Sequence, residues 1–526
     1  MEKEYDVLVV GASNAGGFAA AAAAEKGAKV LMIDKAGSTA YLYRETIASL
    51  NSKVQQEAGI KIDRNELVNF LMEFAQDNVD QQLLNTWADK SSETVDWLDE
   101  EILRPHGAYL QATADAYYET PMNKAFPTGN EVTRPDGEYW QMGYGQWVLD
   151  KAEADGAEIR WQTKLQHLVV EDGKVVGAVV EDVKRKQSYK IFAKNVIICT
   201  GGYGSNKALM EKWNPLGLKT NMYTDSQRDD GSGMVAALEV GAAKDESPAS
   251  IVFNRATVPV GTNAKDFYEV DLTPPNDPGY LWLGSYPFLR VNLRGERFYN
   301  ESAPYQFAMN AAARQPGYMQ AMIWNEETMD DEHLRAVHTL GCSRLGFPGI
   351  FTAEEARQEV ADRLAEGLVK KADTIEELAE QLELPVDTLK KTVERYNDLC
   401  HQGKDEDFGK ESYRMLALDQ GPYYGAMLGG RLLATLDGLR VNTKMQVLRE
   451  DGEVIPGLYA AGNCSGGFFF GSYPDHVPGL TVSHAQTFGR LAGQIAAGED
   501  KPVVHKAAAV KVDASSSASQ SSVERF

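Results

Sequence analysis

Residues 5–34, YDVLVVGASNAGGFAAAAAAEKGAKVLMID, decide the fold of this chain. The apolar run at residues 7–10 has the length and β-branched content of a buried parallel strand. A glycine turn, an alanine-rich helix and a second apolar strand at residues 30–33 follow it. In a βαβ unit of this kind, the turn and the helix N-terminus bind a pyrophosphate. The pattern therefore predicts a dinucleotide-binding site.

The glycine positions and the following acid support this prediction. Gly11 permits the tight turn, and Gly16 lets the helix pack closely on the strand. Asp34 ends the second strand, about 20 residues beyond the turn, where an acid accepts hydrogen bonds from a ribose. Ser13 departs from the G-x-G-x-x-G pattern at its middle glycine. The alternative, a βαβ unit without a ligand, does not account for the position of the acid.

Length and composition limit the possible architectures. A chain of 526 residues is too long for one core and should form two or three domains. A formal net charge of -23 argues against nucleic acids and anionic membrane surfaces as partners. No apolar run reaches the roughly 20 residues that span a bilayer. The first strand begins at about residue 5 and leaves no room for a signal peptide, so we expect a cytoplasmic protein unless an export signal was removed.

The cysteines predict no metal site. Cys199, Cys342, Cys400 and Cys464 are scattered and form no C-x-x-C pair. Because thiolate ligands of zinc and iron–sulfur clusters come in such pairs, we expect neither here. Buried small apolar residues are the better interpretation.

The rest of the chain divides into segments of different character. Two strand patterns flank Asp172-Gly173 as a hairpin, and a further strand at residues 190–200 ends in Gly201-Gly202. The loop at residues 228–233 precedes a helix and suggests another phosphate or sugar contact. Mixed strands, loops and charged helices then indicate an inserted domain. We expect a first dinucleotide-binding segment at 1–250, the insertion at 251–433, a second segment of the dinucleotide-binding domain at 434–500, and a disordered tail at 501–526.

Three blocks together resemble a known family. They are the N-terminal turn, the ICTGG end of the strand at residues 198–202, and GLYAAGN at residues 457–463 with its following helix. In order and spacing they resemble the FAD-binding domain of fumarate reductases, succinate dehydrogenase flavoproteins and 3-ketosteroid dehydrogenases. The inserted domain carries the matching VN..G.RF.NE signature at residues 291–301. The resemblance implies an α/β fold: a Rossmann-like FAD-binding domain in two segments, with an inserted α+β cap domain over the substrate.

The resemblance also implies the cofactor contacts. The adenosine and pyrophosphate end would lie at the first turn, the path between the two ends at the second glycine pair, and the ribityl chain and flavin ring at the C-terminal block. No histidine for covalent attachment occurs at residues 35–44, so we expect non-covalent FAD. The expected contacts are Gly11, Ser13, Ala15, Gly16, Asp34, Lys35, Leu165, Thr200, Gly201, Gly202, Asp230, Gly462, Asn463, Gly479, Leu480 and Thr481.

Within the family, this chain lacks the cations that hold a dicarboxylate. Tyr305 stands where fumarate reductases carry the proton-donating arginine, and Ala434 stands at the position of a substrate histidine. The loop at residues 468–479, FFFGSYPDHVPG, contains no arginine. A dicarboxylate would lie unpaired in a buried site, which is costly. Fumarate and succinate are therefore disfavoured as substrates.

The replacements resemble 3-ketosteroid dehydrogenases instead. In that group, a tyrosine after NE..P transfers a proton and a tyrosine in the later loop helps to polarise the ketone, which implies these roles for Tyr305 and Tyr473. His476 is an alternative acid. The PDHVPG run departs from that group, whose loop is shorter and richer in glycine. The competing interpretations are a rigid surface loop for Tyr473 and His476, and a packed cap residue for Tyr305.

We therefore expect an FAD-dependent oxidoreductase acting on a CH–CH bond conjugated to a carbonyl, on a neutral enone-like or ketosteroid-like substrate. No haem motif or second dinucleotide fingerprint is found, so electrons would pass to or from a separate carrier. One alternative is reduction of an unsaturated carboxylate of the urocanate, cinnamate or fumarate type, which would need Arg255, Arg290 or Arg431 near the flavin. Another is a non-catalytic flavin or electron-transfer subunit.

Overall fold

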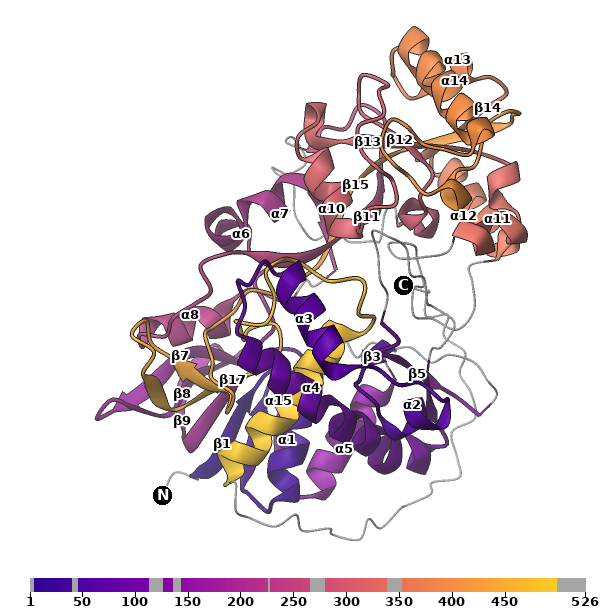
Figure 1. Ribbon diagram of the computed structural model, residues 1–526. Helices are drawn as coiled ribbons and strands as arrows, with labels where there is room; N and C mark the ends of the chain where they lie inside the picture. Colours follow the sequence, from indigo (N-terminus) through magenta and orange to yellow (C-terminus); the bar gives the residue numbers. More distant parts are fainter. Residues whose placement is uncertain are drawn as a thin grey trace.

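The computed structural model describes residues 4–39, 46–112, 126–135, 143–225, 228–264, 280–337 and 352–498. These residues form two lobes, one around the N-terminal βαβ unit and one around a second sheet (Figure 1). The expected disordered tail, Cys342 and most of the irregular aromatic stretch around Tyr117 and Trp140 lie outside the described residues. The architecture confirms the α/β prediction.

The first sheet is built around β1 (Tyr5–Val10) and has the strand order β16-β17-β9-β1-β2-β6. β1 runs parallel to both neighbours, so that Val7 pairs with Val30 on one side and Asn195 on the other. Because both faces of these strands are covered, β1 and β2 read as continuous apolar runs. The other strands of this order are β2 (Val30–Ile33), β6 (Glu158–Arg160), β9 (Gln187–Ile198), β16 (Gln446–Leu448) and β17 (Val454–Ala460).

Two helices from opposite ends of the chain pack together in this lobe (Figure 1). They are α1 (Asn14–Glu25) and α15 (Leu480–Ala497). A Cβ atom on Gly489 would lie 2.2 Å from the Ala15 carbonyl oxygen, and one on Gly493 would lie 2.2 Å from that of Ala19. The helices therefore approach as closely as their backbones allow. This contact explains why the alanine-rich helix is buried throughout.

The predicted hairpin is confirmed as β7 (Thr163–Glu171) and β8 (Lys174–Asp182), which extend antiparallel from β9. A small sheet of β3 (Thr46–Ala48), β5 (Gly129–Thr133) and β4 (Tyr109–Ala112) lies on the other side of the lobe. The helix that follows Asp63 ends at Phe74, because Gln76 and Asp77 take positive φ values. The lobe's remaining helices are α2 (Lys53–Glu57), α3 (Arg64–Phe74), α4 (Gln81–Trp97), α5 (Tyr144–Ala154), α6 (Lys207–Trp213), α7 (Pro215–Thr220) and α8 (Ser232–Glu239).

The second sheet forms the centre of the cap lobe and follows the order β12-β13-β15-β11-β18, with β10 and β14 also paired to β15. Two of its strands lie outside residues 251–433: β10 (Asn221–Thr224) and β18 (Gly471–Ser472). The division of the chain into domains stays a prediction, and these strands show where the lobes exchange chain segments. The other strands are β11 (Ala249–Val258), β12 (Leu289–Val291), β13 (Gln320–Asn325), β14 (Val369–Ala372) and β15 (Tyr423–Thr435).

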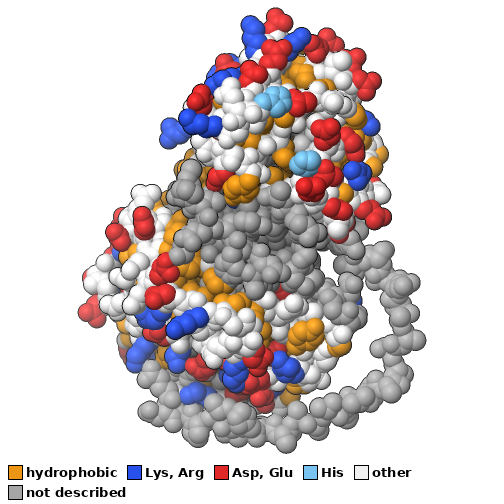
Figure 2. Space-filling model, turned by 45° about the vertical axis from the view of Figure 1, so that its right-hand side comes forward, with side chains coloured by type: hydrophobic (Ala, Val, Ile, Leu, Met, Phe, Trp, Pro, Cys, Tyr) orange, Lys and Arg blue, Asp and Glu red, His pale blue; other side chains and the backbone are white. Residues whose placement is uncertain are grey.

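Helices cover the cap sheet. Two apolar clusters take alternate residues of β13 and β15: one cluster includes Ile323, and the other includes Trp324. A capping box of Thr352 and Glu355 begins α12, and the Thr374 hydroxyl caps α13. Acidic and basic side chains are mixed over the visible face of this lobe (Figure 2). Its helices are α10 (Tyr305–Ala312), α11 (Asp331–Val337), α12 (Ala353–Ala365), α13 (Ile375–Gln381) and α14 (Val386–Gln402).

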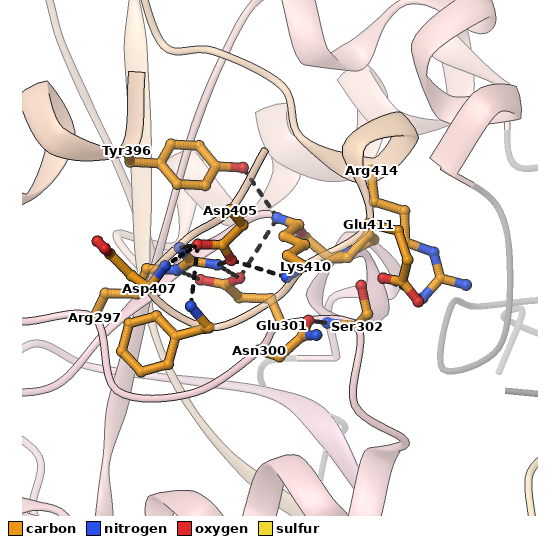
Figure 3. A network of polar contacts seen from close by, with 12 residues as sticks. Arg297, Asn300, Glu301, Ser302, Tyr396, Asp405, Asp407, Lys410, Glu411 and Arg414 are labelled. Carbon is orange, nitrogen blue, oxygen red and sulfur yellow. Dashed lines mark hydrogen bonds and ion pairs between the residues drawn. The ribbon is translucent and has the colours of Figure 1, made fainter. Parts of the chain in front are cut away.

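The VN..G.RF.NE signature forms a buried ion cluster (Figure 3). The Arg297 guanidinium donates to both oxygens of Glu301 at 2.7 Å and to both oxygens of Asp405 at 3.0 and 2.7 Å. Lys410 is buried beside them, with its Nζ 3.6 Å from Glu301. Asp405 lies 108 residues from Arg297, so the cluster ties the start of α10 to the loop after α14. The signature thus serves the packing of the cap.

No helix among the described residues is long and apolar enough to cross a membrane.

Candidate functional site

A cleft opens at the carboxyl ends of β1, β2, β9 and β17, beside the N-termini of α1 and α15. It encloses about 1140 Å³ of space not filled by protein atoms. In open α/β sheets, ligands bind at this edge. The residues from the predicted set that line it are Gly11, Ser13, Ala15, Asp34, Lys35, Leu165, Thr200, Gly201, Gly462, Asn463 and Thr481.

Asp34 holds the first turn in place. Its carboxylate accepts hydrogen bonds from the backbone N–H groups of Ala12, at 2.8 Å, and Ala36, at 2.7 Å. The Thr39 hydroxyl donates to the Ala12 carbonyl oxygen at 3.0 Å. The acid predicted to contact a ribose thus also fixes the loop along which that ribose would lie.

Two predicted glycines lie behind the cleft wall. A Cβ atom on Gly16 would lie 1.8 Å from the Gly11 carbonyl oxygen, and one on Gly202 would lie 2.0 Å from the Thr435 hydroxyl oxygen. Neither residue lines the cleft. Their small size is explained by close packing, against the Gly11 backbone for Gly16 and against the Thr435 side chain for Gly202.

Asp230 lies in a hollow that adjoins the cleft and shares Lys164, Leu165 and Ser232 with it. Its carboxylate pairs with Lys35 at 2.9 Å and with Lys164 at 3.3 Å. Burial acts to raise the pKa of Asp230, but Lys35 and the hydrogen bonds from Ser232 outweigh it and lower the pKa below its ordinary value. Asp230 is thus ionised, and it fixes two lysines at the cleft entrance.

The cleft residues fit FAD. Neither α1, which begins after Ser13, nor α15, which begins after Gly479, has a side chain capping its N-terminus. Both helix starts face the cleft, where backbone N–H groups and the helix dipole favour anionic and electron-rich groups. The Thr200 hydroxyl is buried in the cleft wall and has no hydrogen-bond partner among the described residues. These groups provide donors at both ends of the cleft.

The loop of residues 471–479 brings Tyr473 to the start of α15. The Tyr473 hydroxyl accepts a hydrogen bond from the Leu480 N–H at 2.9 Å and donates one to the Val477 carbonyl at 3.1 Å. Burial raises the pKa of Tyr473, so its phenol stays neutral and keeps its proton. Gly479 is the N-cap of α15 with φ 78°, and its carbonyl accepts from the Ala48 N–H at 3.1 Å. Gly479 and Leu480 thus shape the cleft end without lining it.

The same loop contacts Tyr305, the first residue of α10. The Asp475 carboxylate accepts a hydrogen bond from the Tyr305 N–H at 3.0 Å. The Tyr305 ring packs edge-on against Phe253, with centroids 5.1 Å apart, and lies 5.4 Å from the Arg255 guanidinium. Burial raises the pKa of Asp475 to about 7, although the Tyr305 N–H and the charge of Arg255 act to lower it. The loop of residues 471–479 thus carries Tyr473 and contacts Tyr305, and neither tyrosine is among the residues that line the cleft.

The His476 ring packs on α3 of the flavin lobe. The ring contacts Phe70 and Phe74, with centroid distances of 5.0 and 5.7 Å. Burial lowers the pKa of His476 to about 4, so the imidazole is neutral at pH 7. Its role as an acid stays a prediction, which this apolar packing does not favour.

The arginines considered for a carboxylate substrate have different surroundings. Arg290 is buried in the cap and donates to the backbone carbonyls of Gly284 and Tyr286. Arg431 pairs with Asp225. Only Arg255, of these three, is found beside Tyr305. Ala434 lines the cleft, so the position that carries a histidine in fumarate reductases is apolar here.

Sequence reasoning gave no role to Phe468, Phe469 or His484. Phe468 and Phe469 pack on the His484 ring at 4.5 and 5.3 Å, and Phe488 packs on it at 4.7 Å. The phenylalanines are core residues here. His484 is fully buried, and neither ring nitrogen has a hydrogen-bond partner among the described residues. Burial lowers the pKa of His484 to about 3.

Sequence reasoning also gave no role to two acids, Asp229 and Asp475. Asp229 accepts from the Gly202 N–H at 3.2 Å, and Asp475 accepts from the Tyr305 N–H. The first stands in the RDDGSG loop that was expected to contact the cofactor. The second belongs to PDHVPG, the run that departs from the ketosteroid dehydrogenase pattern. That departure was the available signal for Asp475.

Comparisons with known proteins place this cleft in context. A family model described as "FAD binding domain" matches residues 6–476. The vinyl phenol reductase of Lactiplantibacillus plantarum is 27% identical over 512 residues, covering 94% of this chain and 96% of that protein. The 3-oxosteroid 1-dehydrogenase of Mycolicibacterium smegmatis is 27% identical over 578 residues, covering 93% and 96%. The open conformation of a flavocytochrome c3 fumarate reductase superposes with a TM-score of 0.67 at 25% identity, over 94% of this chain and 78% of that one.

Proposed function

This chain belongs to the FAD binding domain family and is an FAD-dependent oxidoreductase of the CH–CH class, and from this premise we propose that it acts on a neutral, flat substrate whose C=C bond is conjugated to an oxygen-bearing group. An enone or a ketosteroid-like compound is the expected type. When bound, FAD supplies the hydride donor or acceptor, and the side chains discussed below handle the substrate oxygen and the proton.

The observation that carries the proposal is that the loop of residues 471–479 links two tyrosines, the partly buried Tyr473 and the buried Tyr305. Tyr473 is hydrogen-bonded to the N-terminus of α15, which lines the cleft, and Tyr305 is linked to the same loop through Asp475. Reduction of a conjugated C=C bond needs a proton donor at one carbon and a hydrogen-bond donor at the oxygen, where enolate charge develops. Neutral phenols can serve both needs.

We assign the proton transfer to Tyr305 and the polarisation of the substrate oxygen to Tyr473. The Tyr473 O–H now donates to the Val477 carbonyl, so a substrate oxygen would replace that acceptor. The Leu480 N–H, which donates to the Tyr473 oxygen, strengthens the phenol as a donor. The same groups serve dehydrogenation in the opposite direction.

The preference for a neutral substrate follows from the charges. Ala434 adds no charge to the cleft wall, and Arg431 is already paired with Asp225. The Lys35 and Lys164 ammonium groups are paired with Asp230 at the other end of the cleft. A dicarboxylate would need two cations near the tyrosines.

Arg255 favours a second candidate, reduction of an unsaturated monocarboxylate. Its guanidinium is buried and lies over the rings of Phe253, at 3.9 Å, and Trp282, at 4.4 Å, next to Tyr305. One carboxylate could pair with it at this position. The two candidates differ in the charge of the preferred substrate.

An anaerobic reoxidation experiment tests both candidates. The protein is reduced with dithionite, and flavin absorbance is followed after addition of a Δ4-3-ketosteroid, a vinyl phenol, a cinnamate-type acid or fumarate. We expect rapid reoxidation by a neutral compound, slowed about 10²- to 10⁴-fold in Tyr305→Phe, the usual range for a lost general acid. Tyr413→Phe, at an exposed cap tyrosine, is the control and should react like the wild type.

The outcomes separate the candidates. Reoxidation by the cinnamate-type acid alone, lost in Arg255→Met, would favour the carboxylate. Reoxidation by fumarate alone would refute the charge argument, and an unchanged rate in Tyr305→Phe would refute the assignment of the proton donor. The separate electron carrier stays part of the proposal, and flavin reduction by candidate donors measured in the same cuvette tests it.

A further inference from the structure

The loop of residues 471–479 is fastened to the cap sheet at its start. The Gly471 N–H donates to the Pro248 carbonyl at 3.0 Å, and Ser472 pairs with Ser250 in the parallel contact of β18 with β11. This edge strand comes from the C-terminal flavin-binding segment. The loop therefore begins as part of the cap.

The loop is fastened to the flavin lobe at its end. The His476 carbonyl accepts from the Phe126 N–H at 2.7 Å, and the Pro478 carbonyl accepts from the Thr128 hydroxyl at 3.0 Å. The His476 ring packs on α3, and Phe74 of α3 stacks on Phe307 of α10 at 5.6 Å. The two lobes thus meet around this loop.

Between these two attachments of the loop, Asp475 contacts the start of α10. It is 4% exposed, and its side chain accepts the first N–H group of α10, which belongs to Tyr305. The first N–H groups of a helix have no partner within the helix. A carboxylate at this place satisfies one of them and interacts favourably with the helix dipole. The direction of α10, and with it the Tyr305 side chain, is thereby coupled to the loop.

We propose that Asp475 is a positioning residue, which fixes Tyr305 relative to Tyr473 by holding the first turn of α10 on the loop that joins the two lobes. The proposal rests on the proposed function, because Asp475 performs no chemical step itself and acts only through Tyr305. The proposal also gives a role to the PDHVPG run at residues 474–479. The run that departs from the shorter ketosteroid dehydrogenase loop supplies the side chain at residue 475 and the carbonyls at 476 and 478 that make the contacts.

Hydrogen exchange of the Tyr305 amide tests the contact directly. In the FAD-loaded wild type this first-turn amide should be protected, and in Asp475→Ala it should exchange at least tenfold faster. Asp475→Asn keeps an acceptor oxygen and should stay within threefold of the wild type. Asp387→Asn, at an exposed aspartate in the first turn of α14, is the control and should leave the Tyr305 amide unchanged. An unprotected Tyr305 amide in the wild type overturns the proposal even if the alanine variant does not fold.

Single-turnover reoxidation with the best substrate found above tests the positioning role. We expect Asp475→Ala to slow reoxidation 10- to 100-fold at saturating substrate, with unchanged FAD content, and Asp475→Asn to restore at least half of the rate. Equal losses in both variants would overturn the proposal. If no compound reoxidises the wild type, the proposed function fails while the amide measurement still decides whether the contact exists.

Discussion

Arg297 offers a sharp test of how the cap is held together (Figure 3). Replacing it with alanine removes the guanidinium that pairs with Glu301 and Asp405, whose side chains are both fully buried. Lys410 would be the remaining cation of the cluster, at 3.6 Å from Glu301. Asp405 cannot relax into water easily, because it also accepts hydrogen bonds from the backbone N–H groups of Asp407, Phe408 and Lys410.

The expected cost follows from this burial. Removing one partner of a buried ion pair typically costs about 3–5 kcal/mol, since the other charge is left uncompensated. The surface pair of Arg395 and Asp407 provides a matched comparison, because that guanidinium also donates two hydrogen bonds to one carboxylate. Its side chains are 46% and 34% exposed, so we expect Arg395→Ala to cost about 0–1 kcal/mol.

Urea unfolding at pH 7 measures the difference. Tryptophan fluorescence reports on both lobes, because Trp324 is buried in the cap and Trp87 in the flavin lobe, whereas the flavin signal reports on the flavin lobe alone. The cap transition is therefore the part of the fluorescence change that the flavin signal does not follow. We expect Arg297→Ala to lower the free energy of unfolding of the cap transition by about 3 kcal/mol more than Arg395→Ala does. Equal losses in the two variants would refute the reasoning that burial makes the Arg297 cluster essential.

Two further predictions concern the flavin lobe. Thr200→Val removes the buried hydroxyl that has no partner among the described residues, so it should weaken FAD binding by about 0.5–1.5 kcal/mol without lowering the stability of the FAD-free protein. FAD titration measures the affinity and thermal unfolding measures the stability. An unchanged affinity would contradict the fit of this residue to the cofactor. Because burial lowers the pKa of His484 to about 3, the unfolded chain binds a proton below pH 6.5 that the folded chain does not, and stability is lost as the pH falls. Between pH 6.5 and 5 the loss from this group should be about 2 kcal/mol, and urea unfolding of His484→Leu should show a pH dependence reduced by that amount; an identical pH dependence would contradict it.

Local patterns in the sequence predicted much of the flavin lobe. The strand at residues 7–10 and the hairpin around Asp172-Gly173 are set by residues close in sequence, and the structure has both. Periodicity is a poorer guide to where a helix ends. After Asp63 the apolar periodicity continues beyond Phe74, where the helix ends and the backbone of Gln76 takes a positive φ value.

Contacts between distant segments could not be predicted in the same way. β18 pairs with β11 across more than 200 residues, and no periodicity in residues 471–472 marks a strand so short. The VN..G.RF.NE signature was found, but its partner Asp405 lies in an ordinary charged loop. Gly16 and Gly202 were assigned to cofactor contact, which stays a prediction, and the structure shows that close packing also requires a glycine at both positions. A glycine pattern does not distinguish these causes.

We expect the residues that pack the two lobes and the residues that select the substrate to be different ones. Among the features shared with the family, the first turn lines the cleft and the Arg297 cluster holds the cap together, and we expect both to place few demands on the substrate. Of the departures, Ala434 lines the cleft, while Tyr305 and the PDHVPG run contact each other where the two lobes meet. Since a substrate is chosen by the groups it touches, we expect the sequence at these departures to determine the substrate class. Exchanging them would change the substrate before it changed the fold.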